Sequence, residues 1–70
     1  MKFDIYGRFQ IEVVRDDGLW VAYRLALGKR SKVDDFVIPD DLQAQEIPGY
    51  LDAFYHELAR HGQRVVEIST

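Results

Sequence analysis

A histidine-containing string near the end of the chain comes closest to a metal-binding motif. It runs from His56 to His61 as H-E-L-A-R-H, one residue longer than the zinc-protease pattern H-E-x-x-H. In that pattern the two histidines lie at i and i+4, on one face of a helix. Here they lie at i and i+5, about 140° apart around a helix, and Glu57 with His61 offers only two ligands. We therefore predict no metal site and an exposed helical face.

Residues for covalent or acid–base catalysis are few. The chain has no cysteine and no glycine-rich phosphate loop, and its serines are Ser31 and Ser69. Pairs of adjacent aspartates occur at 16–17, 34–35 and 40–41. Neighbours on a strand point to opposite faces, and in turns such residues usually serve as caps. We predict that the protein is not an enzyme and needs no cofactor.

A basic cluster in the first half of the chain could bind phosphate groups. Its members are Arg24, Lys29, Arg30 and Lys32. Trp20 or Tyr23 could stack on a base beside it. The whole chain is acidic, however, with a net charge of -3 and a pI near 5.2, unlike most nucleic-acid-binding domains. Nucleic-acid binding is therefore the alternative prediction.

Charge is unevenly divided along the chain. Residues 1–33 hold seven basic and four acidic side chains, a net +3, whereas residues 34–70 hold two basic and eight acidic ones, a net -6. Such asymmetry can mark an electrostatic docking surface. We favour the simpler interpretation that the two halves of one domain attract each other and that the remaining charges face water.

Length and composition predict one small domain spanning residues 1–70. The chain is 47% hydrophobic and 13% aromatic, and no apolar run approaches the roughly 20 residues that cross a bilayer. Charges recur too often in the first ten residues for a signal peptide, so we expect a cytoplasmic protein that does not bind membranes. A core this small seldom supplies more than about 3–5 kcal/mol. Because the chain has no cysteine and so no disulfides, its small core favours stabilisation by self-association or by a permanent partner.

Alternating apolar and polar residues predict a long N-terminal hairpin. Odd-numbered apolar residues recur over residues 2–15, and the alternation resumes over 19–27. This period of two is typical of half-buried strands. Gly7 falls in the inward series of the first strand, where it predicts a bulge or a close approach of the backbone.

The length of the loop between these strands determines which residues of the two strands lie opposite each other. Residues 16–18 suit a three-residue loop with Gly18 in the left-handed region. That loop pairs Ile11 with Tyr23, whereas a two-residue loop would place Arg24 opposite Ile11 and mix core and solvent faces. We therefore predict the three-residue loop.

The rest of the chain predicts two short strands and a helix. We expect a solvated loop at 28–32, a third strand at 36–38 stopped by Pro39, and a closing strand at 64–69. The main helix should begin near Ile47–Pro48, or as a kinked helix at Leu42. Asp40 and Asp41 are expected to cap a helical turn over Leu42–Glu46, and Gly62 to cap the end of the main helix. Its apolar stripe is Ile47, Leu51, Phe54 and Leu58. The predicted fold class is α+β, an antiparallel sheet packed on one helix in the order β-β-β-α-β.

The outward face of this hairpin provides the candidate interface. In the predicted register its apolar residues are Val14, Trp20 and Ala22, with Tyr6 further along. Contiguous apolar patches often mark interfaces, and tryptophan and tyrosine often dominate binding energy. We predict a non-enzymatic interaction module that forms a homodimer or binds another protein there. The open alternative is that residues 29–38 or the last strand cover Trp20 within the same chain.

Four segments together resemble a known family. They are F-D-I-Y-G-R-F at 3–9, W-V-A-Y-R-L at 20–25, V-I-P at 37–39 and Y-L-D-A-F-Y-H-E-L-A-R at 50–60. Through them the chain resembles, over nearly its full length, a family of small single-domain bacterial proteins, mainly proteobacterial, of unknown function. The family has an uninterrupted helix where this chain has Pro48-Gly49. The resemblance implies a stand-alone bacterial cytoplasmic protein and supplies no activity or site residues.

Overall fold

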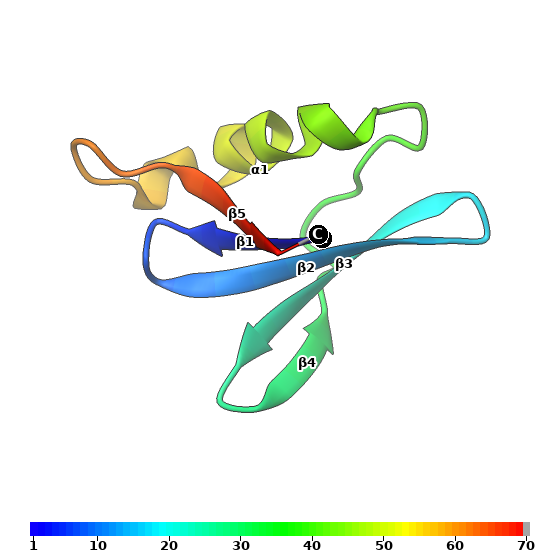
Figure 1. Ribbon diagram of the computed structural model, residues 1–70, viewed down its shortest axis with the longest axis horizontal. Coiled ribbons are helices and arrows are strands. Elements are labelled where there is room, and N and C mark those ends of the chain that lie inside the picture. Colours follow the sequence, from blue (N-terminus) through cyan, green and yellow to red (C-terminus); the bar gives the residue numbers. More distant parts are fainter. Residues whose placement is uncertain (70) are drawn as a thin grey trace.

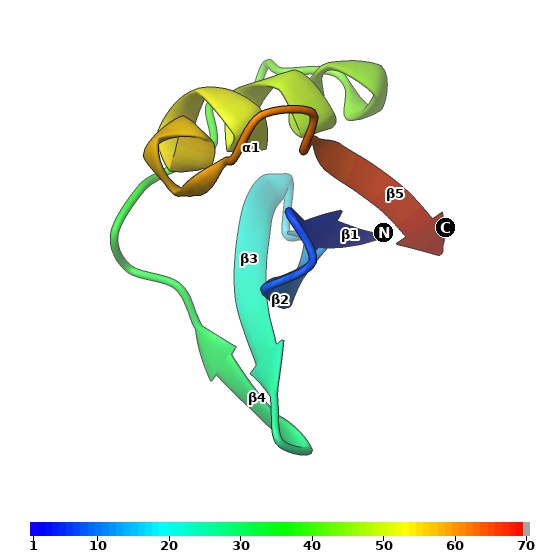
Figure 2. The same ribbon diagram turned by 90° about the vertical axis from the view of Figure 1, so that its left-hand side faces the viewer.

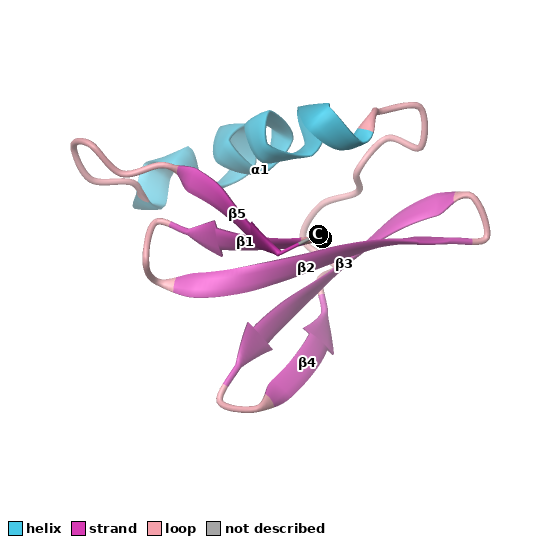
Figure 3. Ribbon diagram, in the orientation of Figure 1, coloured by secondary structure: helices cyan, strands magenta, loops and turns pink. Residues whose placement is uncertain are grey.

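The computed structural model describes residues 1–69 and has one antiparallel sheet with a helix on one face (Figure 1). The sheet order is β4-β3-β2-β1-β5, and every neighbouring pair is antiparallel. The strands are β1 (Lys2–Ile5), β2 (Phe9–Asp16), β3 (Leu19–Ala26), β4 (Lys29–Lys32) and β5 (Val65–Ser69). The helix is α1 (Ile47–Tyr55), with 3-10 turns before it (Ala44–Glu46) and after it (His56–Leu58) (Figure 3). The predicted α+β class is confirmed.

The predicted first strand is divided in two by a turn at Tyr6 and Gly7. Both residues have positive φ, 57° and 71°, and the N–H of Arg8 donates to the carbonyl of Ile5 at 2.9 Å. The turn pairs Ile5 with Phe9. Because these partners are both odd-numbered, β1 and β2 place odd residues on the same face, and the alternation continues through the reversal. A single strand containing a bulge was therefore the wrong interpretation.

The predicted register of β2 and β3 is also wrong. The loop has two residues, Asp17 (φ 53°) and Gly18 (φ 80°), which is the left-handed pair that a type I′ turn requires. Ile11 therefore lies opposite Arg24. Because a slip of one residue exchanges the two faces of a strand, the even residues of β3 face the helix and its odd residues face away. Arg24 is tolerated on the inner face because its guanidinium stacks 4.0 Å from the ring centroid of Phe9.

A third tight turn extends the sheet at the place where a loop was predicted. Leu27 (φ 54°) and Gly28 (φ 75°) reverse the chain, so that Tyr23–Ala26 pair with Lys29–Lys32. A left-handed conformation costs a side-chain-bearing residue roughly 1–2 kcal/mol, so leucine is a poor signal for such a turn. The predicted strand at 36–38 is not formed. That segment passes between β4 and the helix without joining the sheet (Figure 2).

The helix begins at Ile47, as predicted, with Pro48 in its first turn. Gln43, not Asp40 or Asp41, caps the preceding 3-10 turn, since the Gln43 N–H donates to Glu46 Oε1 at 2.9 Å. The helix ends at Tyr55, well before Gly62. No helix within residues 1–69 is long and apolar enough to span a bilayer.

The core lies between the inner face of the sheet and the helix. Side chains of β1 and β2 pack against two turns of α1 and against Ile38. The buried apolar residues are Phe3, Ile5, Tyr6, Ile11, Val13, Ala22, Ile38, Ile47 and Leu51. Of the predicted helical stripe, Ile47 and Leu51 are buried, whereas Phe54 and Leu58 stay 42% and 39% exposed. The closing strand is confirmed at Val65–Ser69.

Candidate interaction surfaces

Trp20 lies on the inner face of the sheet and is partly covered by its own chain. Its indole Nε1 donates to the carbonyl of Leu42 at 2.8 Å. The guanidinium of Arg15 lies 4.0 Å from the centroid of its ring and also donates to the carbonyl of Asp40 at 2.8 Å. Trp20 is therefore covered within its own chain, as the alternative predicted, but the hydrogen-bonded residues are Asp40 and Leu42, which lie after the predicted range 29–38.

The four predicted interface residues do not form one exposed surface. Tyr6 is 3% exposed and Ala22 is 7% exposed, both within the core. Val14 pairs with Val21 on the face of the sheet that points away from the helix. The predicted patch therefore does not exist as such, because the two-residue loop places Trp20 and Ala22 on one side of the sheet and Val14 on the other.

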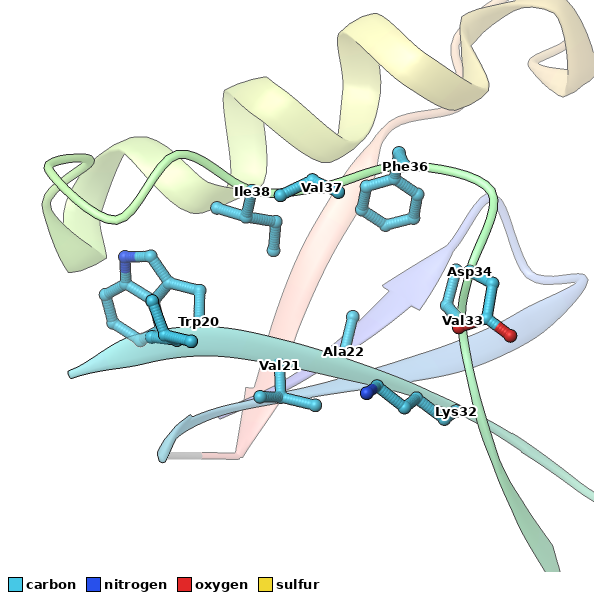
Figure 4. A pocket seen from close by; sticks show the side chains of 10 residues that line it. Trp20, Val21, Ala22, Lys32, Val33, Asp34, Phe36, Val37 and Ile38 are labelled. Atoms are coloured by element: carbon cyan, nitrogen blue, oxygen red, sulfur yellow. The ribbon is translucent and has the colours of Figure 1, made fainter. Parts of the chain in front are cut away.

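Trp20 and Ala22 instead line an open apolar slot. Figure 4 shows Trp20, Ala22, Phe36 and Ile38 projecting into the space between β3 and the segment that follows β4. The cavity measures about 250 Å³. We call it the Trp20 slot and define it by Leu19, Trp20, Val21, Ala22, Phe36, Val37 and Ile38, with Lys32, Val33 and Asp34 at one end.

The rim of the Trp20 slot is apolar and open to solvent. Leu19 is 56% exposed and Val37 is 80% exposed. Sequence reasoning missed both, and it also missed Phe36. The available signal was the run 36–38, whose apolar residues predict burial on some surface even though they form no strand. The structure places this run against the Trp20 side of β3 rather than in the sheet.

The slot exists because β4 pairs only with Tyr23–Ala26, the second half of β3, and leaves the first half of β3 without a partner on that side. The last bond between them runs from the N–H of Val33 to the carbonyl of Ala22, at 2.9 Å. Alternate residues of an antiparallel strand bond to opposite neighbours, so the backbone of Trp20 faces the same edge as that of Ala22. Among residues 1–69 no backbone hydrogen bond links Trp20 to residues 34–38. One wall of the slot therefore offers an unpaired strand edge.

The predicted basic residues gather on the hairpin formed by β3 and β4. They are Arg24, Lys29, Arg30 and Lys32. Arg30 is bound within the chain, because its Nε lies 2.8 Å from Glu12 Oε1 and its guanidinium lies 3.7 Å from the ring centroid of Tyr23. Arg24 stacks on Phe9. In the described part of the chain neither Lys29 nor Lys32 forms an ion pair.

The acidic residues lie in a different layer. Residues 33–59, which include α1 and one wall of the Trp20 slot, contain seven acidic side chains and no lysine or arginine. The ion pair between Arg30 and Glu12 is the one such pair found across residues 1–69, and it lies within the first half of the chain. Across residues 1–69 the predicted attraction between the two halves therefore forms no ion pair, although Arg24 and Lys32 line a pocket with Asp34 and Asp35.

Two tyrosines have perturbed pKa values. Burial, followed by the hydrogen bond to Asp52 and its negative charge, raises the pKa of Tyr6 to about 12. Burial and then the charge of Asp35 raise the pKa of Tyr55, while Arg24 acts in the opposite direction. Both shifts favour the neutral phenol, so both groups serve as hydrogen-bond donors or packing surface at neutral pH.

The histidine string lies beyond the regular helix, in the 3-10 turn His56–Leu58 and the residues that follow it. His56 begins the 3-10 turn after α1, and its Nδ1 lies 3.0 Å from the carbonyl of Ala53. His61 and Glu57 lie beyond the regular helix. Within residues 1–69 no three histidine, aspartate or glutamate side chains come together as a group that could hold a metal ion.

Comparison with known proteins supplies a family but no characterised relative. No curated protein matches the chain, and no solved structure matches it. One family, described as a domain of unknown function, matches residues 1–69. Because this match covers nearly the whole sequence, the chain belongs to the DUF7661 family.

Proposed function

We propose that the protein is a non-enzymatic interaction module that self-associates through the Trp20 slot. The observation that supports this proposal is the open apolar cavity bordered by the exposed side chains of Leu19 and Val37. Exposed apolar surface of this kind often marks a binding site. The proposal keeps the predicted role of Trp20 but moves the contact to the inner face of the sheet.

The slot offers two kinds of interaction to a protein segment. An apolar side chain of leucine size gains roughly 1.5–3 kcal/mol when fully buried, and Phe36 and Ile38 line a space for it. The unpaired edge at Trp20 can exchange hydrogen bonds with an extended backbone, each contributing about 0.5–1.5 kcal/mol. One such contact is weak. Two equivalent contacts in a symmetric dimer would give measurable affinity.

Absolute mass by light scattering on a size-exclusion column, across a concentration series, tests the proposal. Val37→Arg places a charge on the rim at a position that is 80% exposed, so it should leave folding intact. The matched control is Val66→Arg on β5, where the side chain is 45% exposed and lies outside the slot. We expect a dimer for the native chain and for Val66→Arg, and a monomer for Val37→Arg. A Val37→Arg dimer of unchanged stability would rule out the slot as the interface.

Nucleic-acid binding is the second candidate. The observation in its favour is that Arg24, Lys29, Arg30 and Lys32 all lie on one hairpin. It ranks second because Arg30 already pairs with Glu12 and the chain is acidic overall. Binding to a short duplex or single strand should weaken steeply with salt, since neutralised phosphates release counterions. Absence of binding at low salt would exclude this candidate.

The cellular setting belongs to the same proposal. We place the module in the bacterial cytoplasm, as the family resemblance implies. The absence of cysteine from the chain is compatible with a reducing compartment. Fractionation of the native cell followed by immunodetection would test this placement.

A further inference from the structure

Leu27 combines two unfavourable features at one position. It has a φ of 54°, which belongs to the left-handed region, and its side chain is 100% exposed. Asparagine, aspartate or glycine is the usual first residue of such a turn. Leucine does not relieve the strain of a left-handed backbone, and at this position its side chain buries no apolar surface within its own chain. Strain that persists without a local benefit points to a function elsewhere.

The fold places Leu27 at the tip of a projecting hairpin. In two views at right angles, the turn between β3 and β4 lies at the opposite end of the molecule from α1 (Figures 1 and 2). The hairpin residues 22–33 contain four basic side chains and no acidic one. The tip therefore presents one apolar side chain with positive charge behind it.

We infer that the tip of one copy inserts Leu27 into the Trp20 slot of a second copy, and that the second copy does the same in return. This inference rests on the proposed function and identifies the segment that fills the slot. Two reciprocal contacts related by a two-fold axis close the assembly as a dimer, whereas a one-way contact would continue into rings or filaments.

Charge complementarity favours a second copy as the occupant. One wall of the slot, residues 33–38, belongs to a segment, residues 33–59, with seven acidic side chains and no lysine or arginine, while β3 and Lys32 form the rest of the lining. Asp34 lies at one end of the slot, next to Asp35. Within residues 1–69 the only ion pair, Arg30 with Glu12, does not involve this segment. Arg24 and Lys32 line a pocket with Asp34 and Asp35 of the same molecule but form no ion pair with them within residues 1–69. The hairpin of one copy can therefore still attract the acidic segment of another, and this attraction should weaken as salt rises.

The variant Leu27→Asn tests binding without destabilising the fold. Asparagine followed by Gly28 is the preferred pair for a type I′ turn, so relief of about 1 kcal/mol of strain should raise the melting temperature by roughly 4–8 °C. The variant and the native chain are compared at concentrations where both are monomeric, because dimerisation also raises the melting temperature. The same variant removes the side chain that fills the slot. Because both copies lose their leucine, we expect the dimer to dissociate at least about a hundredfold more readily. Because the fold becomes more stable, a lost dimer cannot be attributed to unfolding.

Mixing the variants tests whether tip and slot meet each other. Leu27→Asn keeps an intact slot, and Val37→Arg keeps an intact tip. A mixed pair therefore contains one complete contact, whereas each variant alone contains none. With donor and acceptor dyes on the two variants, energy transfer should appear in the mixture and not in either variant labelled with both dyes.

The possible outcomes separate this inference from the proposed function. If Val37→Arg is monomeric while Leu27→Asn remains a full dimer, the slot binds another segment, and only the inference fails. The mixed pair has one contact and so a weaker affinity than the native dimer, and the mixture must be tested up to the highest soluble concentration. If it shows no more energy transfer there than either variant alone, tip and slot do not meet. If the native chain is monomeric at every concentration, both proposals of self-association are wrong.

Discussion

The hydroxyl of Tyr6 donates a hydrogen bond to Oδ1 of Asp52, with the two oxygens 2.5 Å apart. This contact joins the turn between β1 and β2 to the middle of α1, two elements that are distant in sequence. Tyr6 itself has a positive φ and is almost fully buried. The bond therefore holds a strained turn against the helix, and the stability of the sheet–helix contact should depend on it.

Tyr6→Phe removes this bond while keeping the ring in the core. We expect the free energy of unfolding to fall by about 1–2 kcal/mol, because the hydroxyl donates to a carboxylate. Tyr50→Phe is the matched control, since its exposed hydroxyl donates to a neutral acceptor, the carbonyl of Val37. Urea denaturation of both variants measures the difference. An equal loss in the two would mean that Asp52 adds nothing.

Alkaline pH should destabilise the fold through the same residue. The pKa of Tyr6 is raised to about 12 by burial first and by Asp52 second, so the folded state holds its proton after the unfolded state has begun to lose it near the ordinary value of 10. The resulting stability is complete below about pH 10 and disappears as pH rises through about 12. Denaturation between pH 8 and pH 12 should show this decline.

The Tyr6→Phe variant is the control for that profile. Its decline over the same range should be shallower than that of the native chain. It should not vanish, because burial also raises the pKa of Tyr55. Superimposable profiles for the two proteins would show that Tyr6 does not titrate in this range.

Gly18→Ala and Gly49→Ala should act in opposite directions. Neither glycine has a neighbour that an added Cβ would strike, but Gly18 has a φ of 80° whereas Gly49 lies within α1. Alanine at Gly18 should cost roughly 1 kcal/mol or more, and alanine at Gly49 should stabilise by up to about 1 kcal/mol. Melting temperatures of the two variants test the turn between β2 and β3. A harmless Gly18→Ala would contradict the left-handed turn.

Trp20→Arg and Val21→Arg test the register of the hairpin directly. Trp20 packs on the inner face beneath Leu42, whereas Val21 lies on the outer face. We expect a loss of about 2–4 kcal/mol for Trp20→Arg, because a charge enters the packed side, and about 1 kcal/mol or less for Val21→Arg. The register with a three-residue loop predicts the reverse order. Thermal unfolding of both variants decides between the two registers.

Period-two alternation and helix signals were reliable guides to element type. They correctly predicted the inward series of Phe3, Ile5 and Ile11, the helix start at Ile47 and the closing strand. Alternation was a poor guide to turns. A three-residue reversal at residues 6–8 preserves the odd–even pattern, so the pattern runs through the turn without a visible break.

The face of β3 could not be read from its own residues. Both faces of this strand carry apolar side chains, and its odd series is the more continuous one. The even face of β3 is turned inward because the segment that follows β4 brings Phe36, Ile38 and Leu42 over Trp20 and Ala22. Strand β4 itself was missed because all of its side chains are exposed, so only backbone hydrogen bonds define it.

The sequence by itself determined the class of the fold, the start of the helix, the main core residues of β1 and β2, and the separation of positive from negative charge. These properties are local, or depend only on periodicity and composition. The tertiary structure alone decided which side of the sheet Trp20 occupies, and that Leu19, Phe36 and Val37 border one slot with it. The reason is that a single residue of loop length exchanges the two faces of a strand, and only the rest of the chain, folded back over one of them, selects between the two.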